Sequence, residues 1–98
     1  MVTLRIEHAI HDYETWQRAF DSFADARANA GVQRYAIRQP ADDQRFLTLD
    51  LEFDSAGEAE AFANFLHAHV WSSPDSSPAL AGRPQTQILD LRRVEAHA

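Results

Sequence analysis

Ionisable side chains recur at every second position in several stretches of this 98-residue chain. Arg5 and Glu7 alternate with apolar residues near the start, and Asp50 and Glu52 do the same further along. Successive side chains of a β-strand point to opposite faces, so each stretch would separate a charged face from an apolar one. The sequence therefore predicts one charged sheet face, made of Arg5, Glu7, Arg34, Arg38, Asp50, Glu52, Asp90 and Arg92.

Carboxylates and arginines on one face could transfer protons and bind oxyanions. We expect Asp50 or Glu7 to act as a general base, because a neighbouring positive charge keeps a carboxylate ionised. Arg34 or Arg38 would then hold an anionic or carbonyl oxygen of a substrate. The alternative is a network of ion pairs with a structural role, since charges removed from water are costly unless they are paired.

The histidines add few candidates. His8 lies on the apolar side of its stretch, which favours a buried, hydrogen-bonded histidine over a general base or a haem ligand. His67 and His69 are two positions apart in a predicted helix, so they face different directions and do not form a metal-binding pair. His11 lies in a predicted turn and His97 in a predicted tail, and we therefore predict no metal site.

Several classes of chemistry lack the residues they need. The chain has no cysteine, and its nine basic residues are all arginine, which excludes thiolate and Schiff-base chemistry on this chain. It carries no G-x-S-x-G motif, no P-loop and no G-x-G-x-x-G motif. We therefore expect any catalysis to be free of metal, flavin and other cofactors.

The composition is typical of a globular protein, with 45% apolar and 24% charged residues. A length of 98 residues predicts a single domain over residues 1–98. The net charge of −6 argues against binding to nucleic acid or to an anionic membrane. Without an apolar run of membrane-spanning or signal-peptide type, we expect a cytoplasmic protein. The use of arginine and alanine without lysine indicates a bacterial source.

The periodicity of apolar residues predicts strands over residues 2–10, 32–39, 45–53 and 85–94, and helices over residues 12–30 and 55–70. This order is typical of an α+β ferredoxin-like β-α-β-β-α-β sandwich, an antiparallel four-stranded sheet with two helices on one face. Asp12 and Ser55 are suitable helix N-caps, and Gly31 a suitable C-cap.

The end of the chain is less regular. In the last predicted strand, Leu89 and Leu91 are expected on the apolar face, and the charged face is expected to carry Ile88, Asp90, Arg92 and Val94. Residues 71–87 are rich in serine and proline and predict either a surface loop or a lid anchored by Trp71. Residues 95–98 are expected to be a frayed tail.

Residues from most of the chain resemble one known group of proteins. They are Asp12, Tyr13, Trp16, Phe20, Asp21, Arg27, Gly31, residues 41–43, residues 51–54, Ala59, Phe62 and Pro84. The chain resembles the dimeric α+β barrel superfamily, in particular small bacterial members and its antibiotic-biosynthesis-monooxygenase-like group. The resemblance implies a homodimer in which two sheets face each other and enclose a lumen, with the helices outside.

The resemblance also suggests a function. We expect a protein that binds a small molecule in a polar cavity between the two sheets, lined by Asp50, Glu7, Arg34 and Arg38. One alternative is a cofactor-free monooxygenase or isomerase acting on an aromatic or polyketide-like substrate. A second alternative is a non-catalytic structural or partner-binding module. The sequence leaves open whether the protein is an enzyme.

Overall fold

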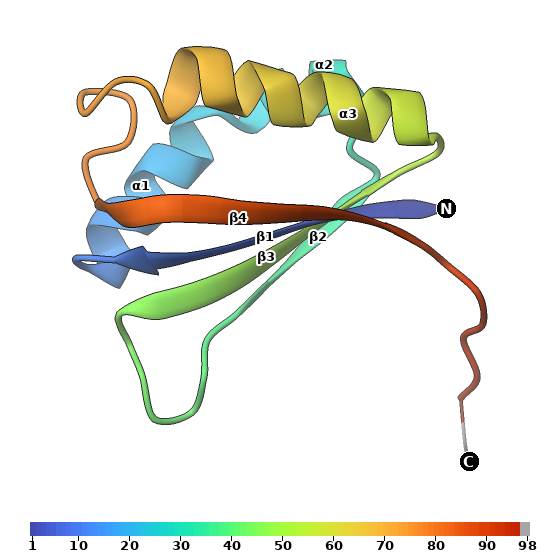
Figure 1. Ribbon diagram of the computed structural model, residues 1–98, viewed down its shortest axis with the longest axis horizontal. Coiled ribbons are helices and arrows are strands. Elements are labelled where there is room, and N and C mark those ends of the chain that lie inside the picture. The colour runs from blue at the N-terminus through green and yellow to red at the C-terminus, as the bar shows by residue number, and fades with distance from the viewer. Residues whose placement is uncertain (97–98) are drawn as a thin grey trace.

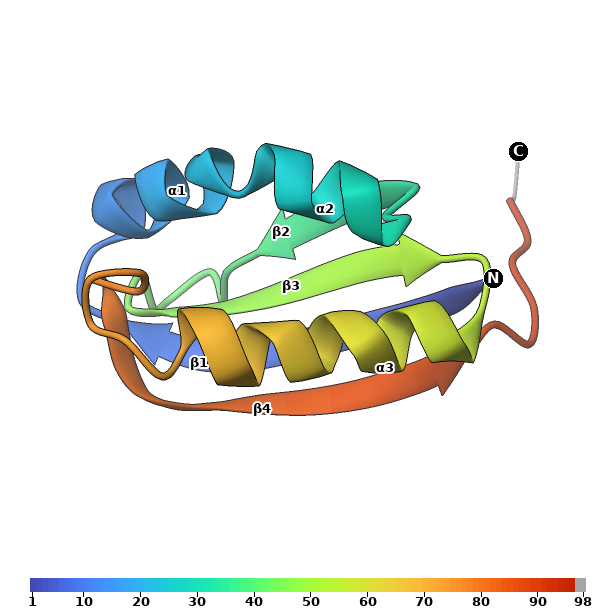
Figure 2. The same cartoon turned by 90° about the horizontal axis from the view of Figure 1, so that it is seen from above.

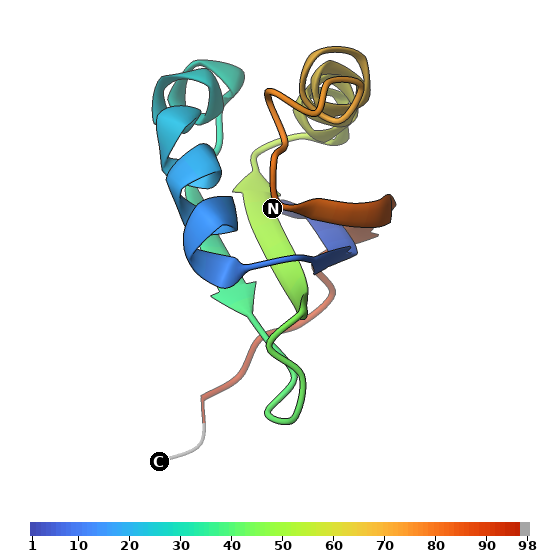
Figure 3. The same cartoon turned by 90° about the vertical axis from the view of Figure 1, so that its left-hand side faces the viewer.

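The computed structural model describes residues 1–96, and its strands form one antiparallel sheet. Strands β1 (Val2–Ile10), β2 (Arg34–Arg38), β3 (Phe46–Phe53) and β4 (Leu80–Asp90) lie in the order β2-β3-β1-β4. Helices α1 (Tyr13–Ser22), α2 (Ala24–Ala30) and α3 (Ala56–Phe65) all lie on one side of it (Figures 1 and 3). The predicted α+β ferredoxin-like fold is confirmed. Residues 97 and 98, and with them the predictions for His97 and the end of the tail, lie outside the described residues.

Burial alternates along the central strands as the sequence predicts. In β1 and β3 every second residue is buried, and Leu4, Ile6, Leu49, Leu51 and Phe53 are at most 5% exposed. Figure 2 shows how the helices divide this face, with α1 and α2 on the side of β2 and β3, and α3 on the side of β1 and β4. The core therefore lies between the sheet and the helices, and the charged side chains are left on the other face.

The predicted helix over residues 12–30 is broken at Phe23. Asp12 caps α1 by accepting a hydrogen bond from the Thr15 backbone N–H at 2.9 Å. At the other end, the Phe20 carbonyl accepts from the Phe23 N–H and from the Arg27 guanidinium. In a continuous helix the Phe20 carbonyl would instead accept from the Ala24 backbone N–H. The sequence contains no glycine or proline at this point, so the break was not predicted.

The predicted helix over residues 55–70 also changes form before its end. Ser55 caps α3 by accepting from the Glu58 backbone N–H at 3.2 Å, as expected. After Phe65 the chain makes a π-helical turn, η1 (Leu66–Val70), which closes with a 2.7 Å hydrogen bond from the Trp71 N–H to the Leu66 carbonyl. Within residues 1–96, no helix has the length and apolar character needed to cross a membrane.

The last strand differs from the prediction in bounds and in orientation. It covers Leu80–Asp90 instead of residues 85–94, so Arg92 and Val94 follow the strand. Leu4, a core residue, pairs with Ile88, which puts Ile88 and Asp90 on the helix-covered side and Leu89 on the open side. The predicted orientation was wrong because leucine and isoleucine occupy adjacent positions there, and the pairing with β1 decides which of them faces the core.

A β-bulge interrupts the pairing of β4 with β1. Glu7 pairs with Gln85, but Ala9 pairs with Ala81, so β4 carries extra residues opposite His8. Gly82 lies in this bulge with φ +97°, a conformation that a side chain disfavours. The bulge therefore lies on the edge strand β4, beside His8 of β1.

The two helix-associated glycines give a paired test of the helix boundaries. Gly31 ends α2 with φ +95°, and a Cβ there would meet the Glu58 carboxylate. We expect Gly31→Ala to lower the free energy of unfolding by about 1–2 kcal/mol because of the left-handed backbone. Gly57 lies in the first turn of α3, where an added Cβ would lie 4.0 Å from the Ser55 hydroxyl oxygen, so Gly57→Ala should raise stability by about 0.5–1 kcal/mol. Urea unfolding of both variants checks this, and equal effects would contradict the assigned boundaries.

Candidate functional site

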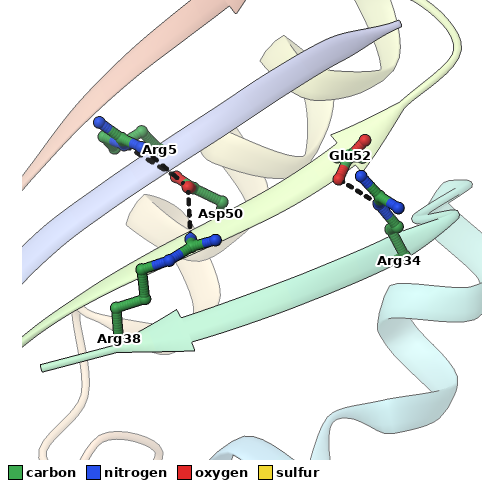
Figure 4. A network of polar contacts seen from close by, with 5 residues as sticks. All are labelled: Arg5, Arg34, Arg38, Asp50 and Glu52. Atoms are coloured by element: carbon green, nitrogen blue, oxygen red, sulfur yellow. Dashed lines mark hydrogen bonds and ion pairs between the residues drawn. The ribbon is translucent and has the colours of Figure 1, made fainter. Parts of the chain in front are cut away.

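The predicted charged face consists of two sets of ion pairs (Figure 4). Arg5 and Asp50 stand opposite each other on β1 and β3, and two hydrogen bonds of 2.9 Å join the guanidinium to the carboxylate. Arg38 reaches the same carboxylate from β2 at 3.2 Å. Arg34 pairs with Glu52, its direct neighbour across the sheet. The structure therefore brings together most of the predicted charged residues, but not Asp90 or Arg92.

This network determines what its carboxylates can do. Hydrogen bonds from Arg5, together with the positive charges of Arg5 and Arg38, lower the pKa of Asp50 from its ordinary value. Asp50 is therefore a stable anion and a weak proton acceptor. Glu7 lies on the same face, between Thr48 and Gln85 on the neighbouring strands. The side chains of Arg34 and Arg38 are 78% and 65% exposed, so one protomer alone encloses no lumen around them.

A second candidate site lies inside the protomer, between the sheet and the helices. It is a cavity of about 70 Å³ with a wall of aromatic and aliphatic side chains. Its lining residues are Ile6, His8, Trp16, Ala19, Phe20, Phe23, Arg27, Leu49, Leu51, Phe62, Leu66, Val70, Trp71, Ser76, Ser77, Ala79 and Leu80. This cavity was not predicted from the sequence.

His8 is one of two buried ionisable residues in the cavity wall. It is 4% exposed, and its Nδ1 lies 3.0 Å from the Ala9 carbonyl oxygen. Because a carbonyl only accepts, Nδ1 carries the proton and Nε2 is a free acceptor in the neutral ring. Burial lowers the pKa of His8 from its ordinary value, which favours this neutral form. The prediction of a buried, hydrogen-bonded histidine is confirmed, and the structure adds that it faces a cavity.

Arg27, the other buried ionisable residue, is 7% exposed. Its guanidinium donates to the Phe20 carbonyl, and its central carbon lies 3.6 Å from the centroid of the Phe20 ring. The same carbon lies 5.4 Å from the centroid of the Tyr35 ring. Burial lowers the pKa of Arg27, but a guanidinium remains charged in proteins. The cavity wall thus contains a permanent positive charge in a mainly apolar setting.

An aromatic row along α1 connects these two residues. The Trp16 ring lies 6.2 Å from the His8 ring and stacks on Phe20 at 5.0 Å, and Phe20 in turn contacts Arg27. Trp16 and Phe20 are one helical turn apart, which is why they stack. His8 and Arg27 therefore lie toward opposite ends of the same stacked pair.

The segment after η1 closes one end of the cavity. Trp71 is half-buried, and its ring centroid lies 4.8 Å from that of His67. The Ala79 carbonyl accepts from the His11 N–H at 2.8 Å, and the Ser77 hydroxyl donates to the Val70 carbonyl at 2.8 Å. This loop is shorter than the predicted segment 71–87, because β4 begins at Leu80. Its role as a lid stays a prediction.

Among residues 1–96, no three histidine or acidic side chains lie close enough together to hold a metal ion.

Comparison with solved structures identifies proteins of the same fold. SnoaB, a cofactor-independent oxygenase from Streptomyces nogalater, is 16% identical, with a TM-score of 0.68 over 95% of this chain and 94% of that one. A monooxygenase from the gene ActVA-Orf6 of Streptomyces coelicolor, in complex with nanaomycin D, is 12% identical, with a TM-score of 0.68 over 99% and 92%.

A dimeric ferredoxin-like protein from an uncultured marine organism is 13% identical, with a TM-score of 0.64 over 95% of this chain and 96% of that one. No family model matches the chain. No curated protein matches it either. The sequence predicted a likeness to antibiotic-biosynthesis-monooxygenase-like proteins. The comparison with solved structures confirms this likeness for the fold.

The ion pairs of Asp50 make stability depend on pH in a defined way. Because the pKa of Asp50 is lowered in the folded state, its contribution is present above the unfolded value of about 3.9 and is lost as the pH falls through the folded value. We expect Asp50→Asn to lower the free energy of unfolding by about 1–2 kcal/mol at pH 7, and by much less at pH 2.

Asp42→Asn is the matched control, since Asp42 lies in an exposed turn. Urea unfolding of both variants at the two pH values gives the comparison. Equal losses for the two variants at pH 7 would show that water screens the network completely.

Proposed function

We propose that the protein is a homodimeric small-molecule-binding protein, and that its ligand lies in the cavity between the sheet and the helices. One observation carries this proposal. Two ionisable residues, His8 and Arg27, are 4% and 7% exposed and line the same mainly apolar cavity. Ligand sites in proteins are typically concave and apolar with a few polar groups, and arginine is rarely buried without a partner.

The size of the cavity restricts the ligand. Its volume of about 70 Å³ is roughly half that of an engineered protein cavity, about 150 Å³, that binds benzene. A compact ligand of a few heavy atoms fits without rearrangement. A larger one requires the loop of residues 71–79, and with it Trp71, to move outward.

The homodimer is proposed from the open face of the sheet. Leaving this face bare would expose Phe46 and Leu89, which the strand register places on the same face as the ion pairs. A second copy packed on the same face would bury these side chains and exclude water from the network. In that arrangement the ion pairs would fix how the two sheets align. The dimeric ferredoxin-like neighbour supports the proposal.

Cofactor-free monooxygenase activity is the second candidate function. Isomerase activity is a variant of it, because both begin with the removal of a proton from the substrate by a base. The names of two structural neighbours, a cofactor-independent oxygenase and a monooxygenase in complex with nanaomycin D, favour it. In such a reaction a phenol supplies the electrons and O₂ is the oxidant. One oxygen atom enters the ring to give a quinone, and the other leaves as water.

Two sets of residues could supply the base in that reaction. Asp50 or Glu7 would serve in the lumen of a dimer, with Arg34 or Arg38 stabilising the phenolate. His8 would serve in the cavity, where its neutral ring can accept the phenol proton at Nε2. We favour His8, because Asp50 already accepts hydrogen bonds from Arg5 and Arg38.

Tryptophan fluorescence tests the cavity as a ligand site. Both tryptophans of the chain line it, so a bound aromatic molecule should change their emission. We expect phenol, which enters the cavity when the loop of residues 71–79 moves outward, to change it saturably in the wild type. Ala19→Leu, which fills the cavity from α1, should abolish the saturable change, whereas Ala61→Leu at an exposed position of α3 should preserve it. A linear response to phenol in the wild type, or an unaffected Ala19→Leu variant, would refute the proposed site.

Sedimentation equilibrium tests the dimer. We expect twice the protomer mass of 11.1 kDa at micromolar concentration. Phe46→Glu places a charge on the open face and should yield monomers, whereas Ala61→Glu on the exposed side of α3 should leave the mass unchanged. A wild-type protein that sediments as a monomer would exclude the dimer.

A further inference from the structure

Arg27 holds a positive charge that the described part of the protein neutralises incompletely. Among residues 1–96, no carboxylate oxygen lies within the 4.0 Å of an ion pair with Arg27. Asp21 acts on it from a greater distance and is exposed to solvent. The aromatic rings and the Phe20 carbonyl stabilise the cation, but they carry no full negative charge. A buried cation without an ion-pair partner is stabilised when an anion binds beside it.

The guanidinium also has donors to spare. It carries five N–H groups, and the described contact to Phe20 uses one of them. No fully buried side-chain nitrogen or oxygen in residues 1–96 lacks a hydrogen-bond partner, so the other guanidinium nitrogens reach accessible space. Arg27 is one of the residues that line the cavity, so a ligand bound there lies beside this side chain. Two such donors suit the two oxygens of a carboxylate.

We propose that the cavity binds a short-chain monocarboxylate, with the carboxylate on Arg27 and the hydrocarbon chain among the aliphatic residues of the wall. This inference rests on the proposed function and names the ligand class for the same site. Leu49, Leu66 and Val70 supply the aliphatic wall. The volume of about 70 Å³ limits the ligand to a few carbon atoms.

The charge and donor pattern distinguishes this ligand from other anions. A dianion such as phosphate would bring a second negative charge for which the wall has no cation. The neutral His8 ring presents an acceptor at Nε2, which repels a carboxylate and leaves Arg27 as its anchor. The apolar remainder of the wall favours a hydrocarbon chain over a bare inorganic ion.

Nitrogen-labelled protein and NMR test the proposal with propionate and its neutral isostere, propionamide, at pH 7. The Arg27 Nε–H signal and the indole N–H signals of Trp16 and Trp71 report on the cavity directly. We expect propionate to shift all three saturably, and propionamide to bind about tenfold more weakly or worse. Sodium chloride at the same concentration is the control for a general anion effect and should leave the three signals unchanged.

Arg27→Met keeps an unbranched, flexible side chain and removes its charge, and it should lose propionate binding. If this variant does not fold, Arg27→Lys replaces it, and propionate should then bind more weakly than to the wild type because the paired donors are gone. Propionamide binding as well as propionate, chloride producing the same shifts, or an Arg27 variant with unchanged affinity would overturn the carboxylate inference and leave the cavity a ligand site. The absence of shifts with propionate, propionamide and phenol would overturn both proposals.

Discussion

A sheet with helices on one side can bury only one of its faces in a single core. This constraint decides most features of the molecule. The buried apolar members of β1 and β3 turn toward the helices, and the charged members share the other face. There Arg5 stands directly opposite Asp50, and Arg38 reaches the same carboxylate from β2, so the three side chains pair. The ion pairs thus follow from the packing of the core.

Arg27 links the shape of the helical layer to the chemistry of the cavity. Its guanidinium takes the Phe20 carbonyl and ends α1, and the chain resumes as α2 after Phe23. The same interaction brings a charge to the wall of the cavity, beside the stacked rings of Trp16 and Phe20. A straight helix would keep that carbonyl bonded internally and would leave Arg27 without its anchor. The helix break and the buried charge are therefore two results of one contact.

The parts of the fold that depend on neighbouring residues were predictable from the sequence. Strict alternation located β1 exactly, and the caps at Asp12, Gly31 and Ser55 bounded the helices. The prediction of which β4 side chains face the helices was wrong. That orientation depends on pairing with β1, a strand more than 70 positions away in sequence, as between Leu4 and Ile88. Local periodicity carries no information about such pairing.

The sites were predictable to a different extent. The charged face followed from alternation, so Arg34, Arg38 and Asp50 were identified together with their shared surface. Arg27 appeared only as part of a family resemblance, because an isolated arginine in an amphipathic helix usually points to solvent. Its burial goes together with the break at Phe23, and neither has a local signal in the sequence. The cavity exists only once distant elements are assembled.

The bulge in β4 also bears on how copies of the protein can meet. In the strand order β2-β3-β1-β4, β4 is an edge strand. An edge with a continuous row of unpaired N–H and C=O groups can pair with strands of other chains, which leads to aggregation. Gly82 distorts that row, and Pro84 contributes no N–H to it. The other edge, β2, is five residues long. Both edges are therefore poor templates for fibrillar growth, which leaves the broad face of the sheet as the surface on which an ordered, closed assembly can form.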